Sequence, residues 1–247
     1  MSHTMRVIVF ASQKGGSGKT TLAGHIGVQA ELAGAGPVAL IDTDPQGSLA
    51  KWWNCRESPQ PAFIHSVFQN LVHDLDEARA AGFKLVVVDT PPAVTKAISE
   101  VVSFADLVVL PTRPSPHDLR AVGPTIDIVD ARKKPMIFAL NAATPRAKIT
   151  MEAAVALSQH GTVAPVTIYN RTDFAASMID GRTVMEIEPE GKSAEEIKQL
   201  WEYIAQRLAR LDTAPADDSD PVIHAPTFRN VNSLGREVPI FGRRAVS

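Results

Sequence analysis

A short glycine-rich stretch with two lysines carries the clearest chemistry of the chain: Gln13-Lys14-Gly15-Gly16-Ser17-Gly18-Lys19-Thr20-Thr21. Its glycines leave room for backbone N–H groups to point into one concavity, where they bind a polyphosphate. Lys19 would reach the β- and γ-phosphates, and the Thr20 hydroxyl is a ligand for Mg²⁺. The usual pattern, G-x-x-x-x-G-K-[ST], begins with glycine, whereas this stretch begins with Gln13 and Lys14. We predict that Gly15 to Thr21 binds a nucleotide.

Three aspartates follow two apolar runs elsewhere in the chain. Asp42 and Asp44 come after residues 38–41, and Asp89 comes after residues 83–88. Acidic residues at the carboxyl ends of strands lie where ligands bind in open α/β sheets. Phosphoryl transfer to water needs a metal and a group that orients the water. We assign Asp42 and Asp89 to Mg²⁺ and Asp44 to the water, with turn and helix-cap roles as the alternative.

The order of the remaining elements predicts how these residues are positioned. Strands alternate with helices, which predicts an α/β fold with a mostly parallel twisted sheet covered by helices on both faces. Near-continuous apolar runs fit strands that are buried on both faces. Strands are expected at 7–11, 38–41, 62–65, 83–88, 107–111, 135–140 and 163–168. Helices are expected at 20–33, 48–55, 66–81, 95–104, 116–132, 149–159, 173–179 and 193–211.

Composition and charge limit the class of protein. The 247 residues are 45% apolar, which suffices for a sizeable core, and the formal net charge is only −2. Cys55 is the single cysteine, so an intramolecular disulfide or a Cys-x-x-Cys site is excluded. No apolar stretch approaches the roughly 20 residues of a membrane span. We expect a cytoplasmic protein with one domain over residues 1–211 and an extended or mobile tail over 212–247.

Taken together, the motifs resemble those of the ParA/MinD ATPases. The stretches 14–21, 42–46 and 88–92 look like that family's deviant Walker A, switch I and switch II motifs. In detail they are most similar to the small, Soj-like ParA ATPases of DNA partition, and the likeness runs from Met5 to Leu211. The resemblance implies a P-loop NTPase fold, ATP and Mg²⁺ as ligands, and hydrolysis of ATP to ADP and phosphate.

The resemblance also implies that the working unit is a homodimer with ATP between its subunits. The signature lysine of the family corresponds to Lys14, which would cross the interface to the phosphates of the other subunit, as an arginine finger does. Lys14, Lys19 and Asp44 are then the predicted catalytic residues. Asn141 resembles the family's adenine contact, with a turn asparagine as the alternative.

Members of the family bind DNA without sequence preference and are stimulated by an adaptor, ParB-like or linked to the cargo. By position, Arg182, Lys192 and Lys198 are the DNA-binding candidates, with Arg171 and Arg207 weaker, although each could be an ordinary solvated charge. The implied function is to segregate or position a plasmid, a chromosome or another cargo on the nucleoid.

A MinD-like ATPase that works at a membrane surface is the alternative function. Such proteins normally carry a C-terminal amphipathic membrane helix. Residues 238–244 are a weak candidate, because Pro239 and Gly242 disfavour a helix. Iron–sulfur carriers with the same loop need paired cysteines, which this chain lacks. We therefore favour the DNA-positioning function.

Overall fold

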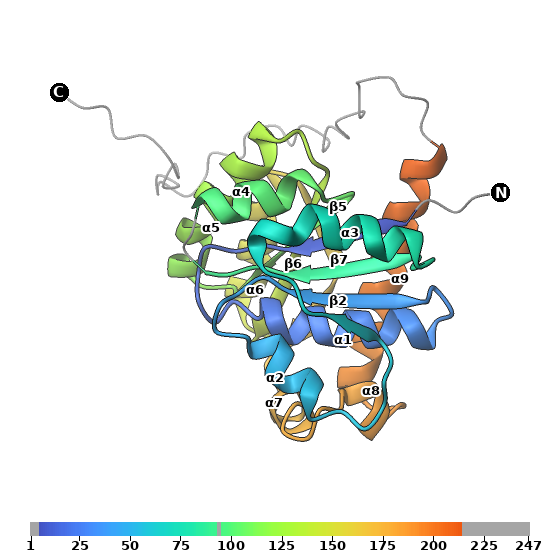
Figure 1. The fold of residues 1–247 in the computed structure, drawn as a ribbon. Helices are drawn as coiled ribbons and strands as arrows, with labels where there is room; N and C mark the ends of the chain where they lie inside the picture. The colour runs from blue at the N-terminus through green and yellow to red at the C-terminus, as the bar shows by residue number, and fades with distance from the viewer. Residues whose placement is uncertain (1–4, 93–94, 214–247) are drawn as a thin grey trace, which may run out of the picture.

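A parallel β-sheet forms the centre of the fold in the computed structural model, which describes residues 5–92 and 95–213 (Figure 1). Within this described part of the chain the sheet has seven strands, in the order β3-β2-β4-β1-β5-β6-β7, and every neighbouring pair is parallel. The strands are β1 (Arg6–Phe10), β2 (Val38–Asp42), β3 (Ala62–Ile64), β4 (Leu85–Asp89), β5 (Leu107–Thr112), β6 (Met136–Ala143) and β7 (Thr162–Tyr169). The predicted α/β fold is confirmed.

The register of the central strands brings the predicted site residues to one edge of the sheet. Asp89 at the end of β4 pairs with Phe10 at the end of β1 on one side. On its other side it pairs with Asp42 at the end of β2. Because the strands are parallel, their carboxyl ends meet at the edge where ligands bind in such sheets. The glycine-rich loop leaves β1 at this same edge.

Helices cover both faces of the sheet and close two apolar cores (Figure 1). Successive residues of β1 alternate between the cores: Ile8 and Phe10 enter the first, and Val7 and Val9 the second. The helices of the first face are α1 (Lys19–Leu32), α2 (Ser48–Asn54), α7 (Thr172–Ser177), α8 (Val184–Ile187) and α9 (Lys192–Thr213). Those of the second are α3 (Leu71–Ala80), α4 (Thr95–Ser103), α5 (Pro116–Ala131) and α6 (Lys148–Ser158).

Three elements differ from the sequence prediction. The helix expected from residue 66 begins at Leu71, because Val67 is extended and a 3₁₀ turn, η1 (Phe68–Asn70), intervenes. Strand β6 runs past residue 140 to Ala143, through two shifts of register against β7. Helix α8 was not predicted; it is a single turn, held by a capping box between Thr183 and Glu186.

The long C-terminal helix covers the sheet, as its periodicity predicts. Ile197, Leu200 and Ile204 of α9 are fully buried in the first core. The residues of the proposed tail from 214 on, including the stretch 238–244, lie outside the described residues. Over the helices that are described, none combines the length and apolar character needed to cross a bilayer.

A fully buried histidine ties α1 to the C-terminal helices. The His25 Nε2 atom accepts a hydrogen bond from the Val184 N–H at 3.3 Å and lies 3.4 Å from the Ser177 hydroxyl. Its Nδ1 atom therefore carries the proton and donates to the Thr21 carbonyl at 2.8 Å. Burial lowers the pKa of His25 from 6.5 to about 4. The folded protein consequently holds this ring in its neutral form.

This burial makes a pH-dependent prediction for stability. Between pH 6.5 and pH 4 the unfolded chain binds a proton at His25 that the folded chain does not, so folding loses stability as the pH falls. The lowered pKa corresponds to a loss of roughly 3 kcal/mol in the free energy of unfolding at low pH. We expect His25→Gln, which cannot titrate, to be less stable than the wild type at pH 7.5 and to approach it by pH 5. Urea unfolding measures the free energy of unfolding of both proteins at the two pH values. A difference between variant and wild type that is the same at both pH values would contradict the prediction.

Candidate functional site

The glycine-rich loop has a conformation that needs glycine at two positions. Gly16 and Gly18 have φ values of 73° and 100°, which side chains disfavour. Moreover, a Cβ atom on Gly18 would lie 2.0 Å from the Asn141 Nδ2 atom. That amide donates a hydrogen bond to the Ser17 carbonyl at 2.8 Å. Asn141 thus supports the back of the loop from β6, a role that the sequence did not indicate, and adenine contact remains a prediction for it.

Lys19, the first residue of α1, lies within the loop. Its side chain is buried, and its Nζ atom donates to the Lys14 carbonyl at 3.4 Å. Burial lowers the pKa of Lys19, whereas the carboxylates of Asp89 and Asp44 raise it. The ammonium group is therefore held inside the loop with two carboxylates in its field, which is the position needed to bind terminal phosphates.

Thr20 and Asp89 form a pair suited to a magnesium ion. The Thr20 hydroxyl donates to the Asp89 Oδ2 atom at 2.5 Å, while the Oδ1 atom of Asp89 is buried without a partner. Burial raises the pKa of Asp89 to about 7, against the lowering effect of the Thr20 hydrogen bond. A divalent cation would satisfy the orphaned oxygen and favour the ionised carboxylate.

The donor set matches what Mg²⁺ prefers. No cluster of three or more His, Cys, Asp or Glu side chains capable of holding a metal occurs in the described residues. Mg²⁺ usually keeps several waters and takes one or two carboxylates together with phosphate oxygens. Thr20 and Asp89 would hold the ion, whose charge would stabilise negative charge that develops on the phosphates. The residues therefore fit the metal that the sequence predicts.

Asp42 serves as a cap for α2. One of its oxygens accepts the Asp44 N–H at 2.9 Å, and the other accepts the N–H groups of Leu49 and Ala50 at 2.9 and 3.1 Å. Burial raises the pKa of Asp42, and these three hydrogen bonds act in the opposite direction. The alternative of a helix cap is thus correct for this residue, and its place in the magnesium shell stays a prediction.

Asp44 is more accessible than Asp42 and faces open space. Its Oδ1 atom accepts the Gln46 N–H at 2.9 Å, which fixes the carboxylate within the turn after β2. Asp42, Asp44, Phe63 and His65 are among the residues that line a hollow of about 300 Å³. Water can therefore reach the Asp44 carboxylate, which is required of a residue that orients an attacking water.

Lys14 forms an ion pair with a buried aspartate of the same chain. Its Nζ atom lies 2.8 Å from the Oδ2 atom of Asp118, near the start of α5; the Asp118 side chain is only 7% exposed, against 34% for Lys14. Ser115, the N-cap of α5, donates its hydroxyl to the same oxygen and accepts the Asp118 N–H at 3.1 Å. Sequence reasoning missed Asp118, although Ser-x-x-Asp before an apolar run is a cap signature.

The DNA-binding candidates lie around α7, α8 and α9, and two of them have local partners. Arg182 is exposed and binds Asp180 through two nitrogens, at 3.0 and 2.6 Å. The Lys198 Nζ atom donates to the Pro189 carbonyl at 2.7 Å. Lys192 is exposed at the start of α9. Of the weaker candidates, Arg171 pairs with Glu196. Their role in DNA binding stays a prediction.

Comparisons with known proteins show which family the chain resembles. The CobQ/CobB/MinD/ParA nucleotide binding domain matches residues 8–209. Maintenance of carboxysome distribution protein A from Halothiobacillus neapolitanus is 32% identical over an alignment of 204 positions, which covers 78% of this chain and 93% of that protein. The chromosome-partitioning ATPase Soj from Thermus thermophilus is 26% identical over an alignment of 269 positions, which covers 94% of this chain and 93% of Soj.

A solved structure shares the fold. The septum site-determining protein MinD from Pyrococcus horikoshii, complexed with Mg-ADP, superposes with a TM-score of 0.69 at 16% identity. The match covers 84% of this chain and 98% of that chain. The nucleotide-binding domain matches most of the chain, and a relative that is aligned over most of its own length is about one third identical to it. The chain therefore belongs to the ParA/MinD family of ATPases.

Proposed function

We propose that this chain is a Mg²⁺-dependent ATPase that positions or segregates a large cargo on DNA. The observation that carries the proposal is the Thr20–Asp89 pair, with its orphaned carboxylate oxygen, beside the glycine-rich loop. Two relatives whose names describe carboxysome distribution and chromosome partitioning support the positioning role. The cargo would be a plasmid, a chromosome or another large cellular body.

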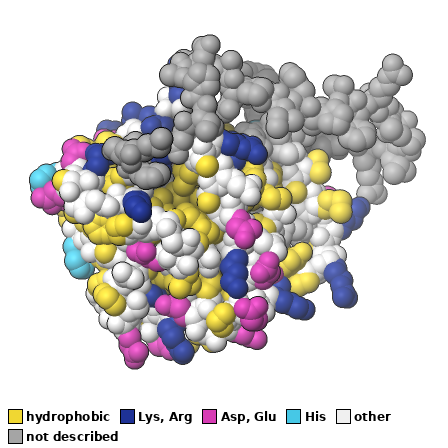
Figure 2. All heavy atoms as spheres, turned by 90° about the vertical axis from the view of Figure 1, so that its right-hand side faces the viewer, with side chains coloured by type: hydrophobic (Ala, Val, Ile, Leu, Met, Phe, Trp, Pro, Cys, Tyr) yellow, Lys and Arg dark blue, Asp and Glu magenta, His cyan; other side chains and the backbone are white. Residues whose placement is uncertain are grey.

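In this proposal ATP joins two copies of the chain, and the ATP-bound dimer binds DNA without sequence preference in the cytoplasm. An adaptor protein stimulates hydrolysis and thereby releases the dimer. The candidate basic residues are Arg182, Lys192 and Lys198. Figure 2 shows the face at the right of Figure 1, where Lys and Arg side chains are interspersed with Asp and Glu. Because the charges on this face are mixed, a basic surface would have to be formed by the candidate residues of two subunits together.

Retention of DNA by the purified protein tests this function. With Mg²⁺ and ATP we expect binding to duplexes of unrelated sequence, and markedly less binding with ADP. Each phosphate contact that is lost should reduce the slope of log affinity against log salt by about one. Lys192→Ala is expected to lower the slope. Lys148→Ala is the matched control, because Lys148 is a 91% exposed lysine on α6, in an ion pair with Glu152.

The same preparation distinguishes the membrane alternative. Vesicles containing anionic lipid are offered to the protein under identical conditions of nucleotide and salt. Pelleting with the vesicles, together with no retention of DNA at low salt, would reject the DNA-based function in favour of the MinD-like one. Retention of DNA without pelleting is the expected outcome.

A further inference from the structure

Helix α2 and the residues that follow it form hydrogen bonds with a segment that lies far away in the sequence, residues 181–186. The Trp52 Nε1 atom donates to the Arg182 carbonyl at 3.2 Å. The Arg56 Nη1 atom donates to the Gly181 carbonyl at 2.6 Å. The backbones also touch: Gly181 has a φ of 82°, and a Cβ atom on it would lie 2.4 Å from the Arg56 nitrogen. The segment with the exposed Arg182 is thus held against the end of α2.

Arg56 is the centre of this attachment. Its side chain is only 2% exposed, and it binds Glu186 through two nitrogens, at 2.8 and 3.1 Å. Its guanidinium also lies 5.0 Å from the centre of the Trp52 ring. Burial acts to raise the pKa of Glu186, but hydrogen bonds from Arg56 and Thr183 lower it overall. Because Arg56 loses its hydration and Glu186 part of its own, we assign this ion pair to fixing the geometry of the segment rather than to adding stability.

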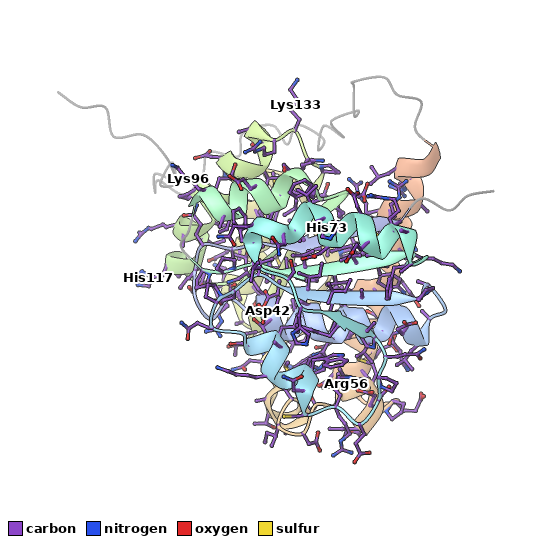
Figure 3. All side chains as sticks on the ribbon, viewed as in Figure 1. Asp42, Arg56, His73, Lys96, His117 and Lys133 are labelled. Carbon is purple, nitrogen blue, oxygen red and sulfur yellow. The ribbon has the colours of Figure 1, made fainter. Side chains whose placement is uncertain are left out.

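The opposite end of α2 is attached to the candidate active site. Asp42 holds the first turn of the helix through the N–H groups of Leu49 and Ala50. Figure 3 shows Asp42 near the start of α2 and Arg56 near its end. Seven residues of helix span about 10 Å. A short, rigid element therefore connects the turn that carries Asp44 with the segment that carries Arg182.

A second attachment joins the same segment to the helix that follows the phosphate loop. The Val184 N–H donates to the His25 Nε2 atom on α1, and Trp52 packs against Gly24 of that helix. A Cβ atom on Gly24 would lie 3.1 Å from the Trp52 ring. Helices α1 and α2, which follow the glycine-rich loop and the turn with Asp44, thus both contact the segment around Arg182.

We propose that Arg56 and Trp52 are positioning residues for segment 181–186, and that α2 couples the state of the nucleotide site to the position of Arg182. A γ-phosphate beside Asp44 would reorganise the turn 42–47, and Asp42 would pass the movement to α2. Arg56 and Trp52 would then pass it to the segment. We expect this coupling to control DNA binding, and that part of the inference rests on the proposed function. The coupling itself is tested without DNA.

Hydrogen exchange of residues 178–188 tests the coupling in the full chain. We expect exchange in the wild type to change by about fivefold or more between the nucleotide-free protein and the protein with Mg²⁺ and a non-hydrolysable ATP analogue. Arg56→Lys keeps the charge but loses the bidentate geometry, so the exchange response of residues 178–188 to the analogue should be clearly smaller than in the wild type. The affinity for the analogue should stay within about twofold of the wild type.

The controls separate coupling from general damage. Arg79→Lys changes an exposed arginine of α3 that pairs with Asp76, and its exchange response should equal that of the wild type. Where Arg56→Lys fails to fold, Trp52→Phe gives the test, because it removes the indole N–H that donates to the Arg182 carbonyl and keeps a smaller aromatic ring. Its response should likewise be clearly smaller than that of the wild type.

Two outcomes overturn the coupling. One is that the exchange rate of residues 178–188 in the wild type does not change when the analogue binds. The other is a full response in Arg56→Lys or Trp52→Phe. Loss of the proposed function is recognised separately: a wild type that never retains DNA but shows the exchange response refutes the DNA role and supports the coupling.

Discussion

Replacing Asp44 by alanine is expected to stop ATP hydrolysis while leaving ATP bound. The Asp44 carboxylate is held by the Gln46 N–H and faces a hollow that water can enter. The phosphates, in contrast, would be bound by the loop and Lys19, which the substitution does not touch. Loss of a group that orients or deprotonates water typically lowers the rate by 10²–10⁴, and we expect a drop of about 10³ in kcat. Single-turnover hydrolysis and equilibrium binding of ATP measure the two effects separately.

A matched control and a contrasting variant sharpen this test. Asp76→Ala removes an exposed aspartate of α3 that pairs with Arg79, and it should leave kcat unchanged. Asp42→Ala should mainly destabilise α2, because it removes the acceptor of three N–H groups. Normal hydrolysis by Asp44→Ala would remove Asp44 from the mechanism.

The local patterns predicted most of the fold, because they depend on neighbouring residues. The run 85–88 is apolar throughout, which is how a strand buried on both faces of a parallel sheet must read. Glycine at positions 16 and 18 indicates a loop whose backbone needs positive φ, and both glycines have positive φ values. Helix α8, by contrast, is a single turn held by Thr183, Glu186 and a distant arginine, so its apolar periodicity is too short to detect.

The contacts that complete the site were beyond sequence reasoning for a physical reason. The Asn141–Ser17 bond joins residues 124 positions apart, and the Arg56–Glu186 pair spans 130. Such pairs form only when the sheet brings distant loops together, and no local spacing encodes which charges will meet. Asp42 shows the opposite limit. Its position at the carboxyl end of a strand was predicted, but both roles considered for it, helix cap and metal ligand, are compatible with the same residue pattern.

Lys14→Ala is expected to abolish the hydrolysis that depends on dimer formation. A cation supplied across an interface to phosphates is typically worth 10³–10⁵ in rate, and we expect a loss of about 10³. Within one chain, the Lys14 ammonium is paired with the Asp118 carboxylate. The resemblance of the loop to the family's motif predicts that Lys14 contacts phosphates bound by a second subunit. Hydrolysis per subunit, measured over a range of protein concentrations, should rise with concentration in the wild type and stay flat in the variant.

Asp118→Asn supplies the complementary result. Asparagine keeps the size of Asp118 and its hydrogen bond to Ser115, but it removes the charge that holds Lys14 within its own subunit. A partly exposed ion pair contributes little free energy, so its loss should favour the dimer only slightly. With a non-hydrolysable ATP analogue, Asp118→Asn should form dimers at protein concentrations at most about fivefold lower than the wild type needs. Sedimentation velocity measures this, with Lys148→Ala as the control. Weaker dimerisation of Asp118→Asn would show that Asp118 belongs to the dimer contact, and concentration-independent hydrolysis by the wild type would place Lys14 outside it.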